Sequence, residues 1–139
     1  MSIKEIQDEI VDEFSMFDDW MQRYEYIIEL GKSLPLIEGQ YKTEDNIIQG
    51  CQSKVWVHAE LQGDKVVFTA DSDAILTKGI IAILIRVFSN QKASAILDAN
   101  TDFIDEIGLK EHLSPTRANG LVSMIKKLKM YALAFNAKN

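Results

Sequence analysis

Cysteine is nearly absent from this sequence: Cys51 is the single one among 139 residues. One cysteine cannot close an internal disulfide, so no covalent cross-link holds the fold together. The same count excludes multi-thiolate zinc sites and cysteine-caged iron–sulfur clusters. Two histidines, His58 and His112, leave a mixed metal site open, but no recognisable ligand spacing joins them to the cysteine. We therefore expect no bound metal, and a reducing compartment such as the cytosol.

Excess positive charge and long hydrophobic runs are also missing. Fifteen Lys and Arg oppose 21 Asp and Glu, which gives a formal net charge of −6. An acidic chain repels phosphate backbones, so we expect no nucleic-acid partner. The longest purely apolar run, residues 80–85, is too short to cross a bilayer, and no secretory signal pattern is present. We expect no membrane partner and a cytoplasmic location.

Motifs for organic cofactors are missing as well. The sequence has no glycine-rich phosphate loop, no nucleophile elbow and no paired-histidine zinc motif. What it has is an ordinary globular composition, with 47% hydrophobic and 26% charged residues. A chain of this length fits one domain, residues 1–139, with a substantial core. We expect a globular domain without a cofactor of its own.

Apolar residues recur at helical spacing in several stretches. Ser2 should cap the first helix, and Gly31 should end the second by taking a left-handed conformation. Asp71 or Ser72 should cap a strongly apolar central helix. Ser114-Pro115 is a typical helix start. The predicted helices cover about residues 3–14, 19–30, 73–88, 93–97 and 102–107, and a last one runs from 115 through Phe135.

A β-hairpin is predicted in the middle of the chain. Residues 55–61 alternate apolar and polar side chains, and residues 65–70 are rich in types that favour strands. Gly63 and Asp64 lie in the turn between them. The fold class is therefore α+β, a small antiparallel sheet packed against several helices, and no third strand can be placed.

The segment around Cys51 is the strongest candidate for chemistry. Cys51 lies in a polar loop that leads into the first strand, and Gly50 leaves space for another molecule to approach the sulfur. Gln52 and Ser53 continue the loop, and Lys54 should favour the thiolate, which is the reactive form of the thiol. These are features of a reactive cysteine, although many lone cysteines are inert small residues.

From the residues alone, three functions stay open. Cys51 could carry a transferred group for a partner protein. It could be the nucleophile of a free-standing hydrolase or thiol peroxidase, with His58 or His112 as its base. It could also be incidental in a purely structural interaction module.

Four stretches of the chain resemble the SufE family, the sulfur acceptors that activate cysteine desulfurases in iron–sulfur cluster assembly. They are residues 20–35, 46–57 with the motif GCQSKVW, 71–79, and 112–121, in this order. The family fold is α+β and is similar to the IscU-type scaffolds. The resemblance moves the carrier hypothesis ahead of the other two.

The resemblance implies that Cys51 accepts sulfur from the persulfide of a SufS-type desulfurase and passes it to a SufBCD-type scaffold. The chain would not be a free-standing enzyme, and pyridoxal phosphate would belong to the desulfurase. A homodimer is among the oligomeric states left open. The partner surface is expected to include Gly50, Gln52, Ser53 and Lys54.

Two further residues in the matching stretches are expected to support the site. Asp73 should tether the Cys51 loop when no partner is bound, and Arg117 should pair with a partner carboxylate or steady the loop. A persulfide exposed to solvent is easily reduced or oxidised. The sequence leaves the resting exposure of Cys51 open; a sheltered sulfur would suit a carrier, and it would require the loop to swing out when a partner docks.

Overall fold

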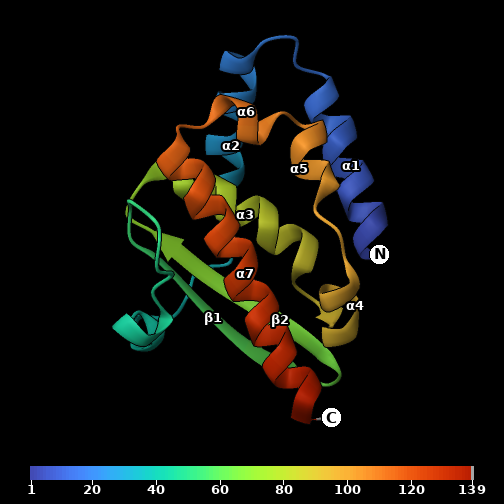
Figure 1. The fold of residues 1–139 in the computed structure, drawn as a ribbon, viewed down its shortest axis with the longest axis vertical. Coiled ribbons are helices and arrows are strands. Elements are labelled where there is room, and N and C mark those ends of the chain that lie inside the picture. Colours follow the sequence, from blue (N-terminus) through green and yellow to red (C-terminus); the bar gives the residue numbers. More distant parts are fainter. Residues whose placement is uncertain (139) are drawn as a thin grey trace.

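The protein, seen here in a computed structural model that describes residues 1–138, has the predicted α+β fold (Figure 1). Its helices and strands follow one another as α1 (Ile3–Ser15), α2 (Trp20–Gly31), η1 (Gly39–Tyr41), η2 (Glu44–Asn46), β1 (Val55–Gln62), β2 (Lys65–Ser72), α3 (Ile75–Phe88), β3 (Gln91–Lys92), α4 (Ala93–Asp98), α5 (Asp102–Glu106), α6 (Leu109–His112) and α7 (Pro115–Lys138). The short helices η1 and η2 are 3-10 helices. None of the helices described in residues 1–138 is both long and apolar enough to cross a membrane.

The first helix begins where the sequence predicts. The Ser2 hydroxyl accepts a hydrogen bond from the Glu5 amide, and the Glu5 carboxylate accepts one from the Ser2 amide, both at 3.2 Å. This reciprocal capping box satisfies two amides that the helix itself leaves unpaired. The predicted helices α4, α5 and α7 are likewise confirmed, whereas the four-residue α6 was not predicted.

The predicted hairpin is confirmed and is longer than expected. β1 and β2 pair antiparallel in one register, from Val55 opposite Ser72 to Gln62 opposite Lys65, and Gly63 turns the chain with a φ of 65°. A third strand, β3, pairs antiparallel with the start of β2. It has only two residues, too few to show the alternation that identifies a strand in sequence.

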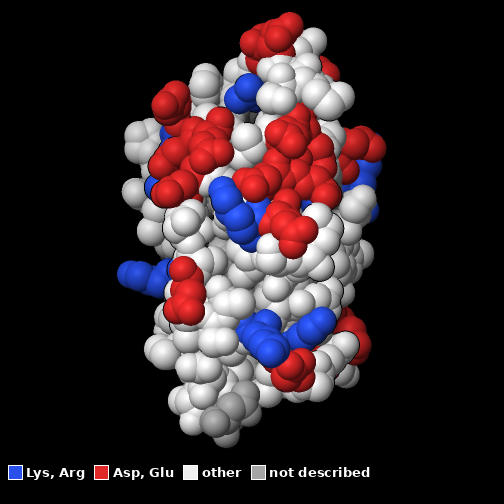
Figure 2. Space-filling view, turned by 90° about the vertical axis from the view of Figure 1, so that its right-hand side faces the viewer, with Lys and Arg blue, Asp and Glu red and all other residues white. Residues whose placement is uncertain are grey.

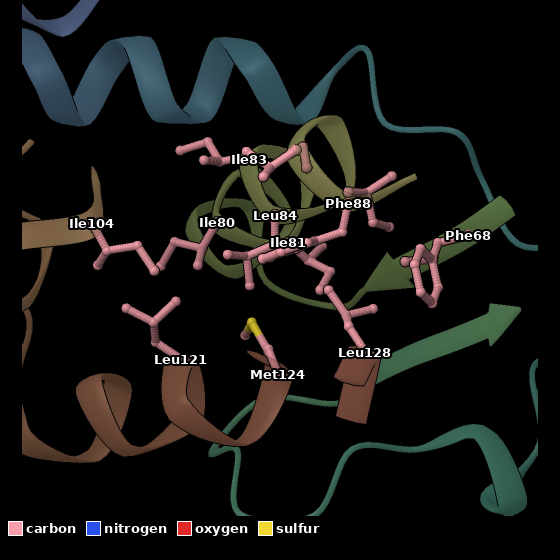
Figure 3. Packing of buried hydrophobic residues seen from close by; sticks show 14 of the residues in the cluster. Phe68, Ile80, Ile81, Ile83, Leu84, Phe88, Ile104, Leu121, Met124 and Leu128 are labelled. Atoms are coloured by element: carbon pink, nitrogen blue, oxygen red, sulfur yellow. The ribbon is translucent and has the colours of Figure 1, made fainter. Parts of the chain in front are cut away.

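Helix α3 is the centre of the hydrophobic core, as predicted. It lies between α2 and α7, and its apolar side chains face Leu121, Met124 and Leu128 of α7 (Figure 3). Of its 14 residues, 11 are buried. A helix that is apolar on nearly all sides can be stable only inside the protein, and burial of its large side chains supplies much of the driving force for folding.

The expected cap of α3 is wrong. The helix begins at Ile75 after Ala74, which makes no side-chain capping bond, while Asp71 and Ser72 belong to β2. Pairing with β1 continues the strand through Ser72, and the Ser72 hydroxyl accepts a hydrogen bond from the Ala74 amide at 3.3 Å, ahead of the helix and not from its first turn. The Asp71 carboxylate instead accepts a hydrogen bond from Lys42 at 2.9 Å, and this lysine and Lys78 hold its pKa below the ordinary value despite its burial.

A charged cluster joins the first three helices. Arg86 of α3 donates hydrogen bonds to Glu9 and Glu13 of α1, and Tyr26 of α2 donates to Glu13. The hydrogen bond from Arg86 lowers the pKa of Glu13, while burial and the bond to Glu13 raise the pKa of Tyr26 to about 12. Glu13 therefore favours the folded state above the carboxyl pKa of the unfolded chain, and that contribution disappears as the pH falls through the lower, folded value.

The role expected of Gly31 is also wrong. Gly31 is the last residue of α2 and does not take a positive φ. It is buried at the crossing with α3, where an added Cβ would lie 3.0 Å from the Gly79 amide nitrogen. An added Cβ on Gly79 would likewise lie too close to α2, against the carbonyl group of Ile27. Glycines are needed here because the two helix backbones approach too closely for side chains, which is a tertiary requirement.

Gly79→Ala is therefore expected to destabilise the protein. Its Cβ would collide with the Ile27 carbonyl oxygen on α2, so the helices would have to separate. We expect the free energy of unfolding to fall by about 1–3 kcal/mol, even though alanine favours helices by about 1 kcal/mol. Urea denaturation followed by circular dichroism would measure this change. Gly39→Ala is the matched control, because no atom lies within 4 Å of its added Cβ. Equal midpoints for the two variants would contradict the prediction.

Candidate functional site

The loop that carries Cys51 is closed at its base by β-type contacts. The Ile48 amide donates to the Val55 carbonyl at 2.8 Å, and Ile47 forms an isolated bridge with Trp56. Ile48 is buried, which anchors the base in the core. The residues between these contacts project as a loop, and this loop lies beside the N-terminal half of α7 (Figure 1).

Two glycines allow this close approach. Gly50 has a φ of 91°, and an added Cβ would lie 2.7 Å from the Ser123 hydroxyl oxygen on α7. A Cβ on Gly120 would lie 3.3 Å from the Cys51 sulfur and 3.6 Å from its Cα. Any side chain at position 120 would therefore occupy the space next to the thiol.

The Cys51 thiol is partly buried, and its surroundings favour the protonated form. Its Sγ donates a hydrogen bond to the Gly120 carbonyl oxygen, with an S···O distance of 3.6 Å. A thiolate has no proton to donate, so this bond favours the neutral thiol. Burial also raises the pKa of Cys51 above its ordinary value. The expected lowering of this pKa by Lys54 is therefore wrong for the resting state, because the desolvation of the sulfur dominates.

A small pocket surrounds the thiol and brings several of the predicted residues together. Gln52, Ser53 and Arg117 line it beside Cys51, and the apolar side chain of Met124 contributes to its wall. Gln52 is exposed, as are Gly50 and Lys54, whereas Ser53 and Arg117 are half-buried. The loop thus presents an exposed backbone and polar side chains to the outside while the sulfur faces α7.

Asp73 binds the far end of the loop. Its carboxylate accepts a hydrogen bond from the Lys54 amide at 3.0 Å, and its own amide donates to the Lys54 carbonyl at 3.2 Å. The Ser72 hydroxyl donates to the same carbonyl at 2.8 Å. Asp73 therefore contacts the loop where it enters β1, just beyond Cys51 in the chain.

Arg117 reaches the site from the first turn of α7. Its amide donates to the Ser114 hydroxyl at 3.3 Å, which caps the helix as predicted. Its guanidinium donates to the Tyr24 hydroxyl of α2 at 3.2 Å. Arg117 thus links α2 to the helix against which the thiol lies. Neither bond runs to the Cys51 loop itself, so in the resting protein Arg117 steadies α7.

Neither histidine is placed to act as a base for Cys51. His58 stacks on Tyr41 with ring centroids 3.7 Å apart, and its Nε2 lies 3.6 Å from the Glu60 carboxylate. His112 stacks on Trp20, and its Nδ1 lies 2.9 Å from the Gly108 carbonyl oxygen. Within residues 1–138 the hydrogen-bond partner of the sulfur is a backbone carbonyl. The free-standing cysteine enzyme therefore lacks the nitrogen that it requires.

Metal chemistry has no obvious place in the described part of the chain. No group of three or more His, Cys, Asp or Glu side chains within residues 1–138 could hold an ion. The groups near Cys51 are instead a backbone carbonyl, hydroxyl residues, an amide side chain and a guanidinium.

Sequence reasoning missed Gly120, Ser123 and Tyr24. Gly120 had one detectable signal, since glycine is unfavourable inside a helix and a buried helix glycine indicates close packing. Ser123 and Tyr24 had none, because each belongs to the site through a contact with a residue distant in sequence.

The raised pKa of Cys51 predicts slow alkylation at neutral pH. We expect the rate with iodoacetamide to rise with pH through an inflection above that of the urea-unfolded chain, because the thiolate is the reactive form. The raised value also means that this group stabilises the fold below the unfolded thiol pKa, and that this contribution is lost as the pH rises through the folded one. The measurement is the alkylation rate of the folded and the unfolded chain across the neutral and alkaline range. Coincident pH profiles would contradict the prediction.

The fold and the site together define a class of protein. It is a small α+β protein that holds one partly buried thiol on a loop between a 3-10 helix and a hairpin, sheltered by a glycine of a long helix. It has neither a histidine base nor a metal cluster within the described residues.

Comparison with known proteins identifies the family. Residues 8–132 match the family described as SufE, Fe-S metabolism associated domain. The chain is 44% identical over 131 residues to an uncharacterised SufE-like protein of Rhizobium meliloti, covering 90% of this chain and 93% of that one. It is 39% identical to SufE-like protein 1, chloroplastic/mitochondrial, of Arabidopsis thaliana, covering 94% of this chain and 35% of that longer protein. The chain therefore belongs to the SufE family, which functions in iron–sulfur metabolism.

A solved structure supports the fold. The solution structure of a hypothetical protein from Thermus thermophilus matches with a TM-score of 0.79 at 20% sequence identity, covering 95% of this chain and 96% of that one. At this identity the match shows that the two proteins share a fold.

Proposed function

We propose that this protein is a sulfur carrier that accepts a sulfur atom on Cys51 and stimulates the enzyme that supplies it. The donor is a SufS-type, pyridoxal-phosphate-dependent cysteine desulfurase, and the recipient is a cluster scaffold of the SufBCD type, in the cytoplasm. The observation that carries the proposal is a single thiol on a loop that rests against a glycine of α7, in a chain of the SufE family.

The proposed transfer is a thiol–persulfide exchange. The Cys51 thiolate attacks the outer sulfur of the donor persulfide, a new S–S bond forms, and the old S–S bond breaks. The donor cysteine leaves as a thiolate, and Cys51 becomes the persulfide. Electrons balance without an outside oxidant or reductant. The cargo is held covalently, so the carrier requires no metal or organic cofactor.

The proposed transfer includes a movement of the loop before the reaction. The sulfur faces Gly120, and both its burial and its hydrogen bond favour the unreactive thiol. In the proposed complex the docked partner draws Cys51 away from α7, which removes both constraints and makes the thiolate accessible. Asp73 holds the Lys54 end of the loop and serves as a fixed point for this movement.

A single cysteine suits this role. An internal second thiol would attack the Cys51 persulfide and release the sulfur as the chain closed a disulfide. This chain has no second cysteine, so the sulfur stays on Cys51 until a recipient thiol arrives. Until then, the partly buried position beside α7 limits the contact of the persulfide with reductants and oxidants.

The proposal is tested by incubating the protein with a SufS-type desulfurase and cysteine, followed by mass spectrometry of the Cys51 peptide. The expected result is the mass of one added sulfur, removed by a reducing agent. Absence of the added sulfur, with an active desulfurase, would overturn the proposal.

A further inference from the structure

Helix α7 is a basic element in an acidic protein. All 21 Asp and Glu residues precede position 112, and α7 contains none of them. The opposite character is seen on the α1 side of the molecule, where carboxylates gather on the surface (Figure 2). Helix α7 therefore differs in charge from the rest of the chain.

Two lysines of α7 are available to an outside partner. Among the ion pairs of the described residues, none involves Lys126 or Lys127. Lys127 lies over the Tyr131 ring, with its nitrogen 5.1 Å from the ring centroid, and Lys126 is exposed. Lys129 differs, because it donates to the Ala99 carbonyl at 2.6 Å and so holds the end of α4.

Exposed apolar side chains lie on the same face of the helix as these lysines. Val122 is 49% exposed, and Met130 and Leu133 are each 58% exposed. With Lys126 they follow the spacing of successive helical turns, which places them on one stripe. The buried side of α7, with Leu121 and Leu128, points toward α3 (Figure 3). The stripe is therefore turned to solvent, and apolar area of this kind commonly marks an interaction site.

A groove connects this stripe to the Cys51 loop. Residues 47–49 form one wall, and Ser123, Lys126, Lys127 and Met130 of α7 form the other, around a volume of about 250 Å³. Residues 47–49 lead directly into Gly50, which contacts Ser123 at the end of the same groove. A chain seated in the groove would therefore press on the segment that positions the thiol.

We propose that the sulfur donor protein docks on this surface through a segment that presents carboxylates beside apolar side chains. The docking face consists of Gln49, Val122, Lys126, Lys127, Met130 and Leu133. The two lysines define the charge of the partner segment, and the exposed Val122, Met130 and Leu133 require it to be apolar as well. This inference rests on the proposed function.

Docking at this face also explains how the sulfur is released from its shelter. The occupant displaces the exposed Gln49 from α7 while the buried Ile48 stays in place, and the Gly50 and Cys51 contacts with Ser123 and Gly120 lie next along the chain. Widening the groove thus draws Cys51 off α7 while Asp73 still holds the loop at Lys54. The thiol becomes reactive only when the donor is in place.

The test compares charge reversals at two places. The double variant K126E/K127E alters the docking face, and K65E/K92E makes the same change in net charge at exposed lysines of β2 and β3, at the turn end of the hairpin. Sulfur loading of Cys51 is measured against desulfurase concentration. We expect the half-saturating concentration to rise roughly tenfold for K126E/K127E, with the saturating rate retained, and to change less than about twofold for the control.

Two further measurements sharpen the result. Met130→Ser should raise the half-saturating concentration by several-fold without changing its salt dependence, whereas the K126E/K127E variant should lose most of the salt dependence of the wild type. Circular dichroism checks that each variant is folded.

The outcomes separate this inference from the function on which it rests. If the wild type never acquires sulfur, the proposed function fails. If the wild type is loaded and K126E/K127E behaves like K65E/K92E, the carrier function stands and the docking face is wrong. If sedimentation shows a wild-type dimer that K126E/K127E dissociates, the face joins two copies of this chain, and the assignment to the donor is overturned.

Discussion

Cys51→Ser is expected to abolish sulfur loading and the stimulation of the desulfurase. A serine hydroxyl has almost no anionic form at neutral pH, so it is a poor nucleophile. It also has no sulfur atom with which to form a persulfide. The fold should survive, because the side chains have similar size and the serine hydroxyl can still donate to the Gly120 carbonyl. The measurements are the mass of the peptide that contains position 51 and the rate of alanine or sulfide release by the desulfurase.

A relocated thiol provides the control for this experiment. Cys51→Ser combined with Ser15→Cys places one exposed thiol at the end of α1, away from the loop. This variant should not be loaded by the desulfurase, because its thiol lies away from the docking surface. Loading of the relocated cysteine at the wild-type rate would show that the position of Cys51 is irrelevant and would contradict the carrier site.

Gly120→Val is expected to release Cys51 from its shelter. The first added carbon would lie 3.3 Å from the sulfur, and the two methyl groups of valine would extend further into that space. The loop should then shift away from α7 and expose the thiol. We expect alkylation at neutral pH to accelerate, because a thiol released from its burial forms the reactive thiolate more readily.

Stability and sulfur retention separate displacement of the loop from general unfolding. Replacing glycine within a helix removes a conformational penalty, so the melting temperature should not fall much. A persulfide formed on this variant should be lost faster to reductants, because the shelter is gone. Asn119→Val, at an exposed neighbouring position of the same helix, is the matched control and should alkylate like the wild type. A wild-type alkylation rate for Gly120→Val would show that Gly120 does not shelter the thiol.

Local pattern predicted most of the helices and the hairpin correctly. The 3.6-residue spacing of α1 and the alternation of β1 depend on neighbours within a few turns or residues, so they are visible without a structure. The errors occurred where a distant segment overrides the local preference. The cap of α3 was misplaced because strand pairing carries Ser72 into β2, and Gly31 was misread because its small size serves the crossing with α3.

The candidate site shows the same division. Residue content alone sets the available chemistry: one cysteine, without a second thiol or a metal-ligand set, can exchange sulfur but cannot form an internal disulfide or hold a cluster. The state of that thiol, in contrast, follows from tertiary contacts. Its pKa rises, and its proton is directed at Gly120, because α7 covers it. The number of cysteines can be read from the sequence alone. The pKa of the thiol depends on its burial and contacts, which arise only when folding brings α7 against the Cys51 loop.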